Sequence, residues 1–132
     1  MHEIIQPAGW PPAKGYANGV LTADGLLFTG GQIGWTAEQR FECRDFVGQA
    51  EQALRNVLDV VEAAGGRAEH ITRLTWYVTD KREYLTRQAD MGAAYRRVLG
   101  RHFPAMAMLI VAGLVEDEAL VEIEGTAVIP RG

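Results

Sequence analysis

Residues 45–64, with the sequence DFVGQAEQALRNVLDVVEAA, carry the clearest structural signal in the chain. Apolar residues recur here at intervals of three and four, the period of an α-helix with one buried stripe; they are Phe46, Ala50, Ala53, Leu54, Val57, Leu58 and Val61. Asp45 is a suitable N-cap, and Gly65-Gly66 is a typical stop signal. We therefore expect a helix from Asp45 to Ala64 that buries one side.

On the N-terminal side of this helix the sequence predicts a β-hairpin. The short apolar runs Gly19–Thr22 and Leu26–Thr29 flank an Asp24-Gly25 pair, which is a strong turn signal. Prolines and glycines interrupt every periodic pattern in Gln6–Gly19, so we expect an ordered loop there.

On the C-terminal side, strands and a second helix follow. Ile71–Val78 is rich in β-branched and aromatic residues, which predicts a strand. Asp80 is a candidate N-cap for a helix that runs to Leu99, with a glycine after its end. Two further strands are expected at Ala107–Ala112 and Leu120–Ile129.

The resulting order, ββαβαββ, predicts an α+β fold with a mixed sheet and two helices on one face. At 132 residues the chain should form a single domain, 1–132. The strand Ala107–Ala112 is apolar on both faces, so the second face of the sheet also needs a cover. Both expected helices cover the first face, so another copy of the chain is favoured as the cover of the second face.

Composition excludes several classes of function. The net charge of -4 and the scattered Lys and Arg argue against a nucleic-acid partner. The single Cys43 suits a reducing compartment, and the dispersed histidines predict no metal site. No signal peptide or membrane-length apolar run is visible, so we expect a cytoplasmic protein without a membrane partner.

Two glycines are candidates for contact with a ligand. Gly30-Gly31 follows a strand but precedes no expected helix, so it does not form a dinucleotide fingerprint. Glycines there allow the backbone to approach a ligand closely and to present its N–H groups. The alternative is a strand end or bulge that requires glycine.

Two carboxylates form a second candidate. Glu122 and Glu124 are two positions apart on an expected strand, which places them on one face at roughly 7 Å. They are solvated charges if that face is exposed. If the face lines a cleft, burial raises the pKa of one of them and makes it a general acid or base.

Three aromatic residues in or beside loops, Trp10, Tyr16 and Trp35, either pack or contact a ligand. Cys43 precedes the first helix and is a weak candidate nucleophile, because no histidine partner is evident.

Seven short segments, in order, resemble the reactive intermediate deaminase (Rid, YjgF-like) family. They are Gly15–Val20, Leu27–Ile33, Gln49–Val57, Ala63–Gly66, Thr75–Asp80, Phe103–Ala105 and Val121–Glu124. The resemblance implies a chorismate-mutase-like fold and a homotrimer with a small-molecule cleft between each pair of subunits. It also implies hydrolysis of enamines and imines, such as 2-iminopropionate, without a metal or an organic cofactor.

Residue by residue, the resemblance implies that Tyr16 lies in the cleft, that the Gly31 backbone contacts the ligand and that Glu122 positions the hydrolytic water. Gly30 stands where the family usually has serine. The family's carboxylate-binding arginine is Met106 here. Methionine cannot hold an anion, so a larger or less polar substrate is expected.

Trp10, Trp35 and Met108 are candidate contacts for that less polar part of the substrate. The alternative is a non-catalytic trimer that binds or senses a small molecule. A ribonuclease, the label that some relatives carry, is the weakest hypothesis, because the chain is acidic and lacks a basic patch.

Overall fold

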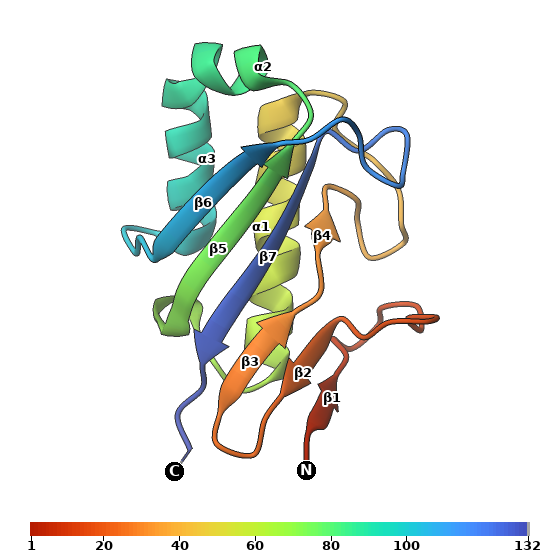
Figure 1. Ribbon diagram of the computed structural model, residues 1–132, viewed down its shortest axis with the longest axis vertical. Helices are drawn as coiled ribbons and strands as arrows, with labels where there is room; N and C mark the ends of the chain where they lie inside the picture. Colours follow the sequence, from red (N-terminus) through yellow and green to blue (C-terminus); the bar gives the residue numbers. More distant parts are fainter. Residues whose placement is uncertain (132) are drawn as a thin grey trace.

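One mixed sheet runs through the molecule, with the helices on one side (Figure 1). The computed structural model describes residues 1–131. The strand order is β1-β2-β3-β7-β5-β6, and β4 pairs with β7. Among the described strands, only β5 and β6 pair in parallel. The strands are β1 (Glu3–Ile5), β2 (Gly19–Leu21), β3 (Leu26–Thr29), β4 (Gln32–Ile33), β5 (Ile71–Val78), β6 (Ala105–Ile110) and β7 (Val121–Val128).

The helices lie on one face of the sheet, as predicted, but there are more of them than the two that the sequence predicts. They are α1 (Phe46–Ala63), the 3-10 turn η1 (Ala68–His70), α2 (Lys81–Thr86) and α3 (Gln88–Leu99). The predicted second helix is therefore two helices, because Arg87 leaves the helical region at φ -121° and ψ 26°. The Thr86 hydroxyl also donates back to the Arg82 carbonyl at 2.8 Å, a contact that bends helices.

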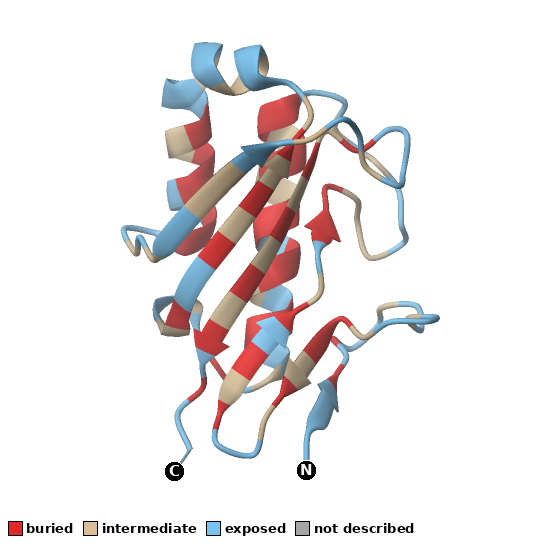
Figure 2. Ribbon diagram, in the orientation of Figure 1, coloured by how far each residue is buried: buried red, intermediate tan, exposed pale blue. Residues whose placement is uncertain are grey.

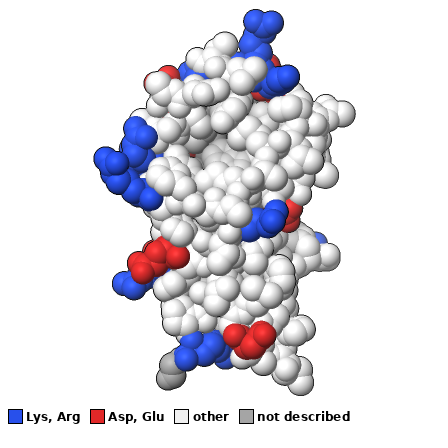
Figure 3. Space-filling model, turned by 60° about the vertical axis from the view of Figure 1, so that its left-hand side comes forward, with Lys and Arg blue, Asp and Glu red and all other residues white. Residues whose placement is uncertain are grey.

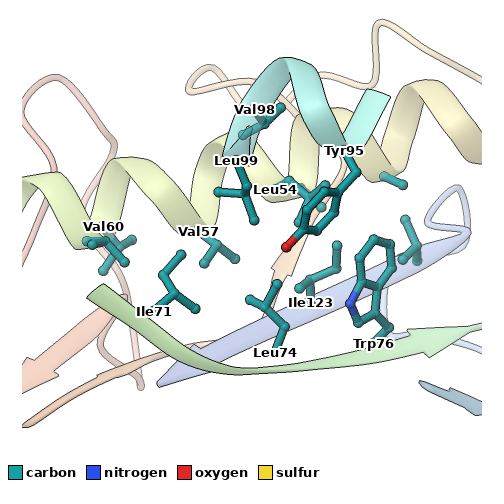
Figure 4. Packing of buried hydrophobic residues seen from close by; sticks show 14 of the residues in the cluster. Leu54, Val57, Val60, Ile71, Leu74, Trp76, Tyr95, Val98, Leu99 and Ile123 are labelled. Atoms are coloured by element: carbon teal, nitrogen blue, oxygen red, sulfur yellow. The ribbon is translucent and has the colours of Figure 1, made fainter. Parts of the chain in front are cut away.

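The core lies between α1, α3 and the sheet. Asp45 caps α1 as predicted, its side chain accepting from the Gly48 amide. Figure 2 shows buried residues alternating along β5 and β7, as a one-sided sheet requires. Leu54, Leu74 and Ile123 are fully buried and pack together (Figure 4).

The predicted hairpin is confirmed, and so are β5 and β7 apart from one-residue differences at strand ends. The strand expected at Ala107–Ala112 instead begins at Ala105 and ends at Ile110, because its register is set by pairing with β5. The short strands β1 and β4 were not predicted; each depends on pairing with a distant segment. At the sheet edge, β6 leaves Met106 and Leu109 44% and 45% exposed.

Candidate functional site

A cleft of about 430 Å³ opens between the loop before β2, the segments on either side of β4 and the start of β7. Five of the residues singled out from the sequence line it together: Trp10, Tyr16, Gly31, Trp35 and Glu122. Their positions in the sequence are up to 112 residues apart, from Trp10 to Glu122. The fold therefore gathers most of the predicted site into one cavity.

Glu122 forms part of the wall of this cleft and lies on the inner strand β7. It alternates with Val121 and Ile123, which are fully buried on the helix side. Its register partners are Ile33 on β4 and Tyr77 on β5. Burial, and secondarily the charge of Glu124, raises the pKa of the Glu122 carboxyl above its usual range. Glu122 is thus a carboxylate suited to taking up a proton.

Gly31 brings the backbone directly against this carboxylate. A Cβ at position 31 would overlap the Glu122 side chain, lying closest to Oε2. Gly30 does not line the cleft. Its amide donates to the Asn18 carbonyl at 2.8 Å, and a Cβ there would lie 2.8 Å from the Ala17 carbonyl oxygen. The backbone therefore requires a glycine at position 30, whereas a side chain at position 31 would have to displace the Glu122 carboxylate.

Buried side-chain amides form hydrogen bonds to the segments that line the cleft. The sequence analysis did not predict these residues. Asn56 of α1 donates to the carbonyl of Ile33 at 3.0 Å and to that of Trp35 at 2.8 Å. Gln32 donates to the Asn18 side chain at 3.2 Å. The available signal was a polar residue within an apolar helical stripe, since Asn56 stands three positions after Ala53 and four before Val60.

Glu124 shares the sheet face with Glu122, as predicted, but is not among the residues that line the cleft. Its carboxylate accepts a hydrogen bond from the Tyr77 hydroxyl on β5. This bond raises the pKa of Tyr77, so the phenol keeps its proton. The two carboxylates therefore have different surroundings, and Glu122 alone faces the cleft.

Met106 and Met108 lie elsewhere in the chain's structure. Both are on the edge strand β6, which β5 separates from β7. They line a different cavity, between β6 and α3. Within one chain the structure therefore does not bring Met106 to the cleft of Glu122. Cys43 lines a third, smaller hollow of about 240 Å³ with Gly48 at the start of α1.

The part of the chain that the structure describes, residues 1–131, contains no cluster of three His, Cys, Asp or Glu side chains that could hold a metal ion. Over the same residues, no helix is both long and apolar enough to cross a membrane.

Curated relatives match almost the whole chain. A RutC family protein of Haemophilus influenzae is 32% identical over 128 residues, which cover 97% of this chain and 98% of the relative. The 2-iminobutanoate/2-iminopropanoate deaminase of Salmonella typhimurium is 33% identical over 132 residues, with coverage of 97% and 98%.

Solved structures share the fold. The YjgF gene product of Escherichia coli aligns with a TM-score of 0.80 at 33% identity, covering 96% of this chain and 98% of that chain. The structure of Escherichia coli TdcF with bound serine aligns with a TM-score of 0.81 at 30% identity, covering 97% and 99%. The family profile described as Endoribonuclease L-PSP matches residues 8–129. The chain therefore belongs to the endoribonuclease L-PSP family, the YjgF-like Rid family that its sequence segments resemble.

Proposed function

We propose that the protein hydrolyses an imine or enamine to a carbonyl compound and ammonia, with Glu122 as the catalytic base. The observation that carries this proposal is the Glu122 carboxylate itself, partly buried in the cleft wall against Gly31. Relatives named 2-iminobutanoate/2-iminopropanoate deaminase, at 33% identity, support the reaction class.

In the proposed reaction the carboxylate accepts a proton from water as the water oxygen attacks the C=N carbon. Glu122 passes this proton to the nitrogen as the C=N bond becomes single, which gives a carbinolamine. Glu122 then takes the proton of the new hydroxyl and delivers it to the amino nitrogen, so that the C=O bond forms, the C–N bond breaks and ammonia leaves. Tyr16 orients the ligand in this scheme, and the Gly31 backbone N–H polarises the reacting group. An enamine enters the same sequence as its imine tautomer.

The substrate we propose is larger or less polar than 2-iminopropionate. Among the described residues that line the cleft, none is Lys, Arg or His, while Glu116 and Glu122 are acidic. A substrate carboxylate would lose its hydration there without gaining a cationic partner. Trp10 and Trp35 instead offer apolar surface to an aryl or acyl group.

We also propose that copies of the chain assemble through the sheet face opposite the helices, as a homotrimer with its ligand at the subunit boundaries. Four apolar residues on that face are between 45% and 65% exposed: Ile4, Phe28, Leu109 and Val128. Such exposure favours burial by another subunit. In that assembly a neighbour contributes Met106 where the family has its arginine.

The test compares the wild-type protein with Glu122→Gln and with Glu116→Gln, a matched change in the same cleft. Ammonia release is followed with freshly generated 2-iminopropionate and with a panel of aryl enamines. We expect Glu122→Gln to lower the rate by about 10²–10⁴, the usual contribution of a general base. Glu116→Gln should retain most of the rate. Unchanged turnover by Glu122→Gln would contradict the mechanism.

A Met106→Arg variant in the same assay tests the substrate. It should gain activity on 2-iminopropionate, because a guanidinium binds a carboxylate through two charge-assisted hydrogen bonds. The second candidate function, binding or sensing without catalysis, is favoured by the cleft's lack of a cationic residue. It predicts saturable ligand binding with no turnover by either protein.

Ribonuclease activity, which the family description mentions, is not proposed for this chain. The net charge is -4, and the cleft carries two acidic side chains. A phosphate backbone would be repelled there.

A further inference from the structure

One side of the Glu122 cleft is formed by residues 7–17, which we call the aromatic loop because Trp10 and Tyr16 on it line the cleft. Figure 3 shows the α3 and β6 side of the molecule, hollowed within an area of uncharged side chains, and Met106 lines a cavity there. The proposed assembly brings Met106 of a neighbouring subunit to the cleft. The aromatic loop, in contrast, comes from the same chain as Glu122.

Few hydrogen bonds hold the aromatic loop to the rest of the fold. Within residues 1–131, the bonds of this loop go only to one another or to the Gln6 side chain. The Gln6 Nε2 donates to the carbonyls of Trp10 and Pro11, at 3.4 and 3.0 Å. Over these residues, Gln6 is therefore the one side chain outside the loop that its hydrogen bonds reach.

Packing alone does not fix the whole of the aromatic loop. Trp10 is partly buried against the core, but Tyr16 is 58% exposed. Gly9 and Gly15 are in the left-handed region, at φ 84° and 82°, and a Cβ at either would meet no atom within 4 Å. Glycines in such open positions have wide conformational freedom. The position of the segment between them therefore depends on the side-chain bonds of Gln6.

The buried residue Asn18 connects Gln6 to the other side of the cleft. Its Nδ2 donates to the Gln6 Oε1 at 3.0 Å, and its Oδ1 accepts from the Gln32 Nε2 at 3.2 Å. Asn18 and Gln32 are 6% and 4% exposed, and both line the cleft. The Asn18 backbone carbonyl also accepts from the Gly30 amide at 2.8 Å. These side-chain amides thus join the aromatic loop to β4.

The orientation of each amide in this chain of bonds is fixed from both ends. Backbone carbonyls accept at the two ends, those of the aromatic loop from Gln6 and that of Gly30 from Gln32, at 3.3 Å. A carbonyl accepts only from an N–H, so Gln6 turns its Oε1 toward Asn18, and Gln32 offers its Nε2. Asn18 then has a single orientation that satisfies both neighbours. A residue at position 6 that cannot donate would therefore release the loop.

We propose that Asn18 is a positioning residue: acting through Gln6, it holds the aromatic loop in place, and so it determines how tightly a bulky substrate binds. Hydrogen bonds of a buried amide are stronger than those of an exposed one. Aromatic side chains that are held in place before binding lose less conformational entropy when the substrate binds. The effect on the substrate rests on the proposed hydrolysis, whereas the order of the loop is a property of the free protein.

The test uses two variants that break this connection. Gln6→Met should fold, because Gln6 is exposed, and methionine cannot donate to the carbonyls of the loop. Asn18→Ala breaks the connection at its centre, and where it does not fold, Gln6→Met alone decides. Lys14→Met is the matched control, since it places the same residue at an exposed position of the same loop.

The first readout is the backbone order parameter of the aromatic loop, measured by NMR relaxation in the free protein. Wild-type protein and Lys14→Met should give about 0.85, the value of rigid backbone, whereas Gln6→Met and Asn18→Ala should fall to about 0.6 or below. Unchanged order parameters in Gln6→Met overturn the inference.

The second readout is steady-state hydrolysis of a bulky aryl enamine. Gln6→Met should raise KM about three- to tenfold, the effect of losing roughly one neutral hydrogen bond of order. Its kcat should stay within about twofold of the wild-type value, because Glu122 is untouched. An unchanged KM, or a loss confined to kcat, overturns the role in substrate binding. If the wild-type protein turns over no substrate, the proposed hydrolysis fails and the order parameters alone decide this inference.

Discussion

Gly31 lies so close to Glu122 that a Cβ at position 31 would overlap the Glu122 carboxylate. The absence of a side chain at position 31 therefore leaves room for the carboxylate of the proposed base. Gly31→Ala should displace the carboxylate and lower kcat/KM by about a hundredfold, as small misplacements of catalytic groups do. Steady-state ammonia release measures this. Gly92→Ala, on α3 and with room for a methyl group, is the matched control and should keep full activity. Wild-type rates for Gly31→Ala would contradict the role of this contact.

The pH dependence of the reaction should reflect the environment of Glu122. Burial and the Glu124 charge raise the pKa of Glu122, so activity should fall on acidification at a pH above that of an ordinary carboxyl. Glu124→Gln removes the like charge and should move this acidic limb to lower pH. Glu38→Gln, on an exposed loop, should leave the profile in place. The measurement is kcat/KM as a function of pH between about pH 4 and 8. If Glu124→Gln loses activity at the same acidic pH as the wild-type protein, the charge of Glu124 does not influence the pKa of Glu122.

The same pKa shift makes a stability prediction. Because folding raises the pKa of Glu122, its contribution to stability is present below the unfolded-state pKa and is lost as pH rises through the folded-state pKa. At neutral pH the ionised carboxylate is therefore a cost, and Glu122→Gln should raise the melting temperature. At about pH 4 the advantage of the variant should shrink. Thermal unfolding at both pH values measures the difference in melting temperature between Glu122→Gln and the wild-type protein. A difference that grows on acidification would contradict a raised pKa of Glu122.

Asn56 should be a strong determinant of stability near the cleft. Its Nδ2 donates to two backbone carbonyls, of Ile33 and Trp35, and the side chain is 3% exposed. Asn56→Ala leaves both carbonyls unpaired and should lower the free energy of unfolding by about 2–4 kcal/mol. Asn56→Asp should cost more, because a carboxylate cannot donate and would repel both oxygens.

Urea denaturation measures these losses. Gln52→Ala, which removes only the bond from Gln52 to the Asn56 side chain, should cost about 1 kcal/mol or less. If Asn56→Asp is as stable as the wild-type protein, the donated bonds contribute nothing to folding.

Self-association should depend on the sheet face opposite the helices. Leu109 on β6 is 45% exposed there, and a lysine at this position would bury an unpaired charge in the proposed interface. Leu109→Lys should therefore sediment as a smaller species than the wild-type protein. Leu85→Lys, on α2 and 52% exposed, is the control and should leave the mass unchanged. If Leu109→Lys retains the wild-type mass, the assembly uses another surface.

Elements with a strong local signal could be predicted from the sequence. The stripe of α1, the turn at Asp24-Gly25 and the alternation in β7 are set by neighbouring residues, and each appears in the structure. The two-residue strand β4 could not be predicted, because it exists only through the pairing of Gln32 and Ile33 with distant residues on β7. The break at Arg87 was also missed, since the apolar period continues across it.

The candidate site could be predicted only in part, because some of its features depend on how distant segments pair and pack. Sequence patterns and family resemblance identified Tyr16, Gly31 and Glu122, which share one cleft. They could not show that Met106 lies across β5 from Glu122, because that depends on the strand order of the sheet. Nor could they show that Asn18 joins Gln6 to Gln32, because hydrogen-bond partners come from the packed structure.

The position of Glu122 on β7 also bears on how relatives diverge. β7 is an inner strand, held by β3 and β4 on one side and by β5 on the other, and its alternate residues lie in the core. Mutations that shift this strand would also disrupt the core. The loop residues Tyr16 and Glu116 are exposed and lie outside the sheet. New ligand preferences can therefore arise by exchanging loops around a stationary carboxylate.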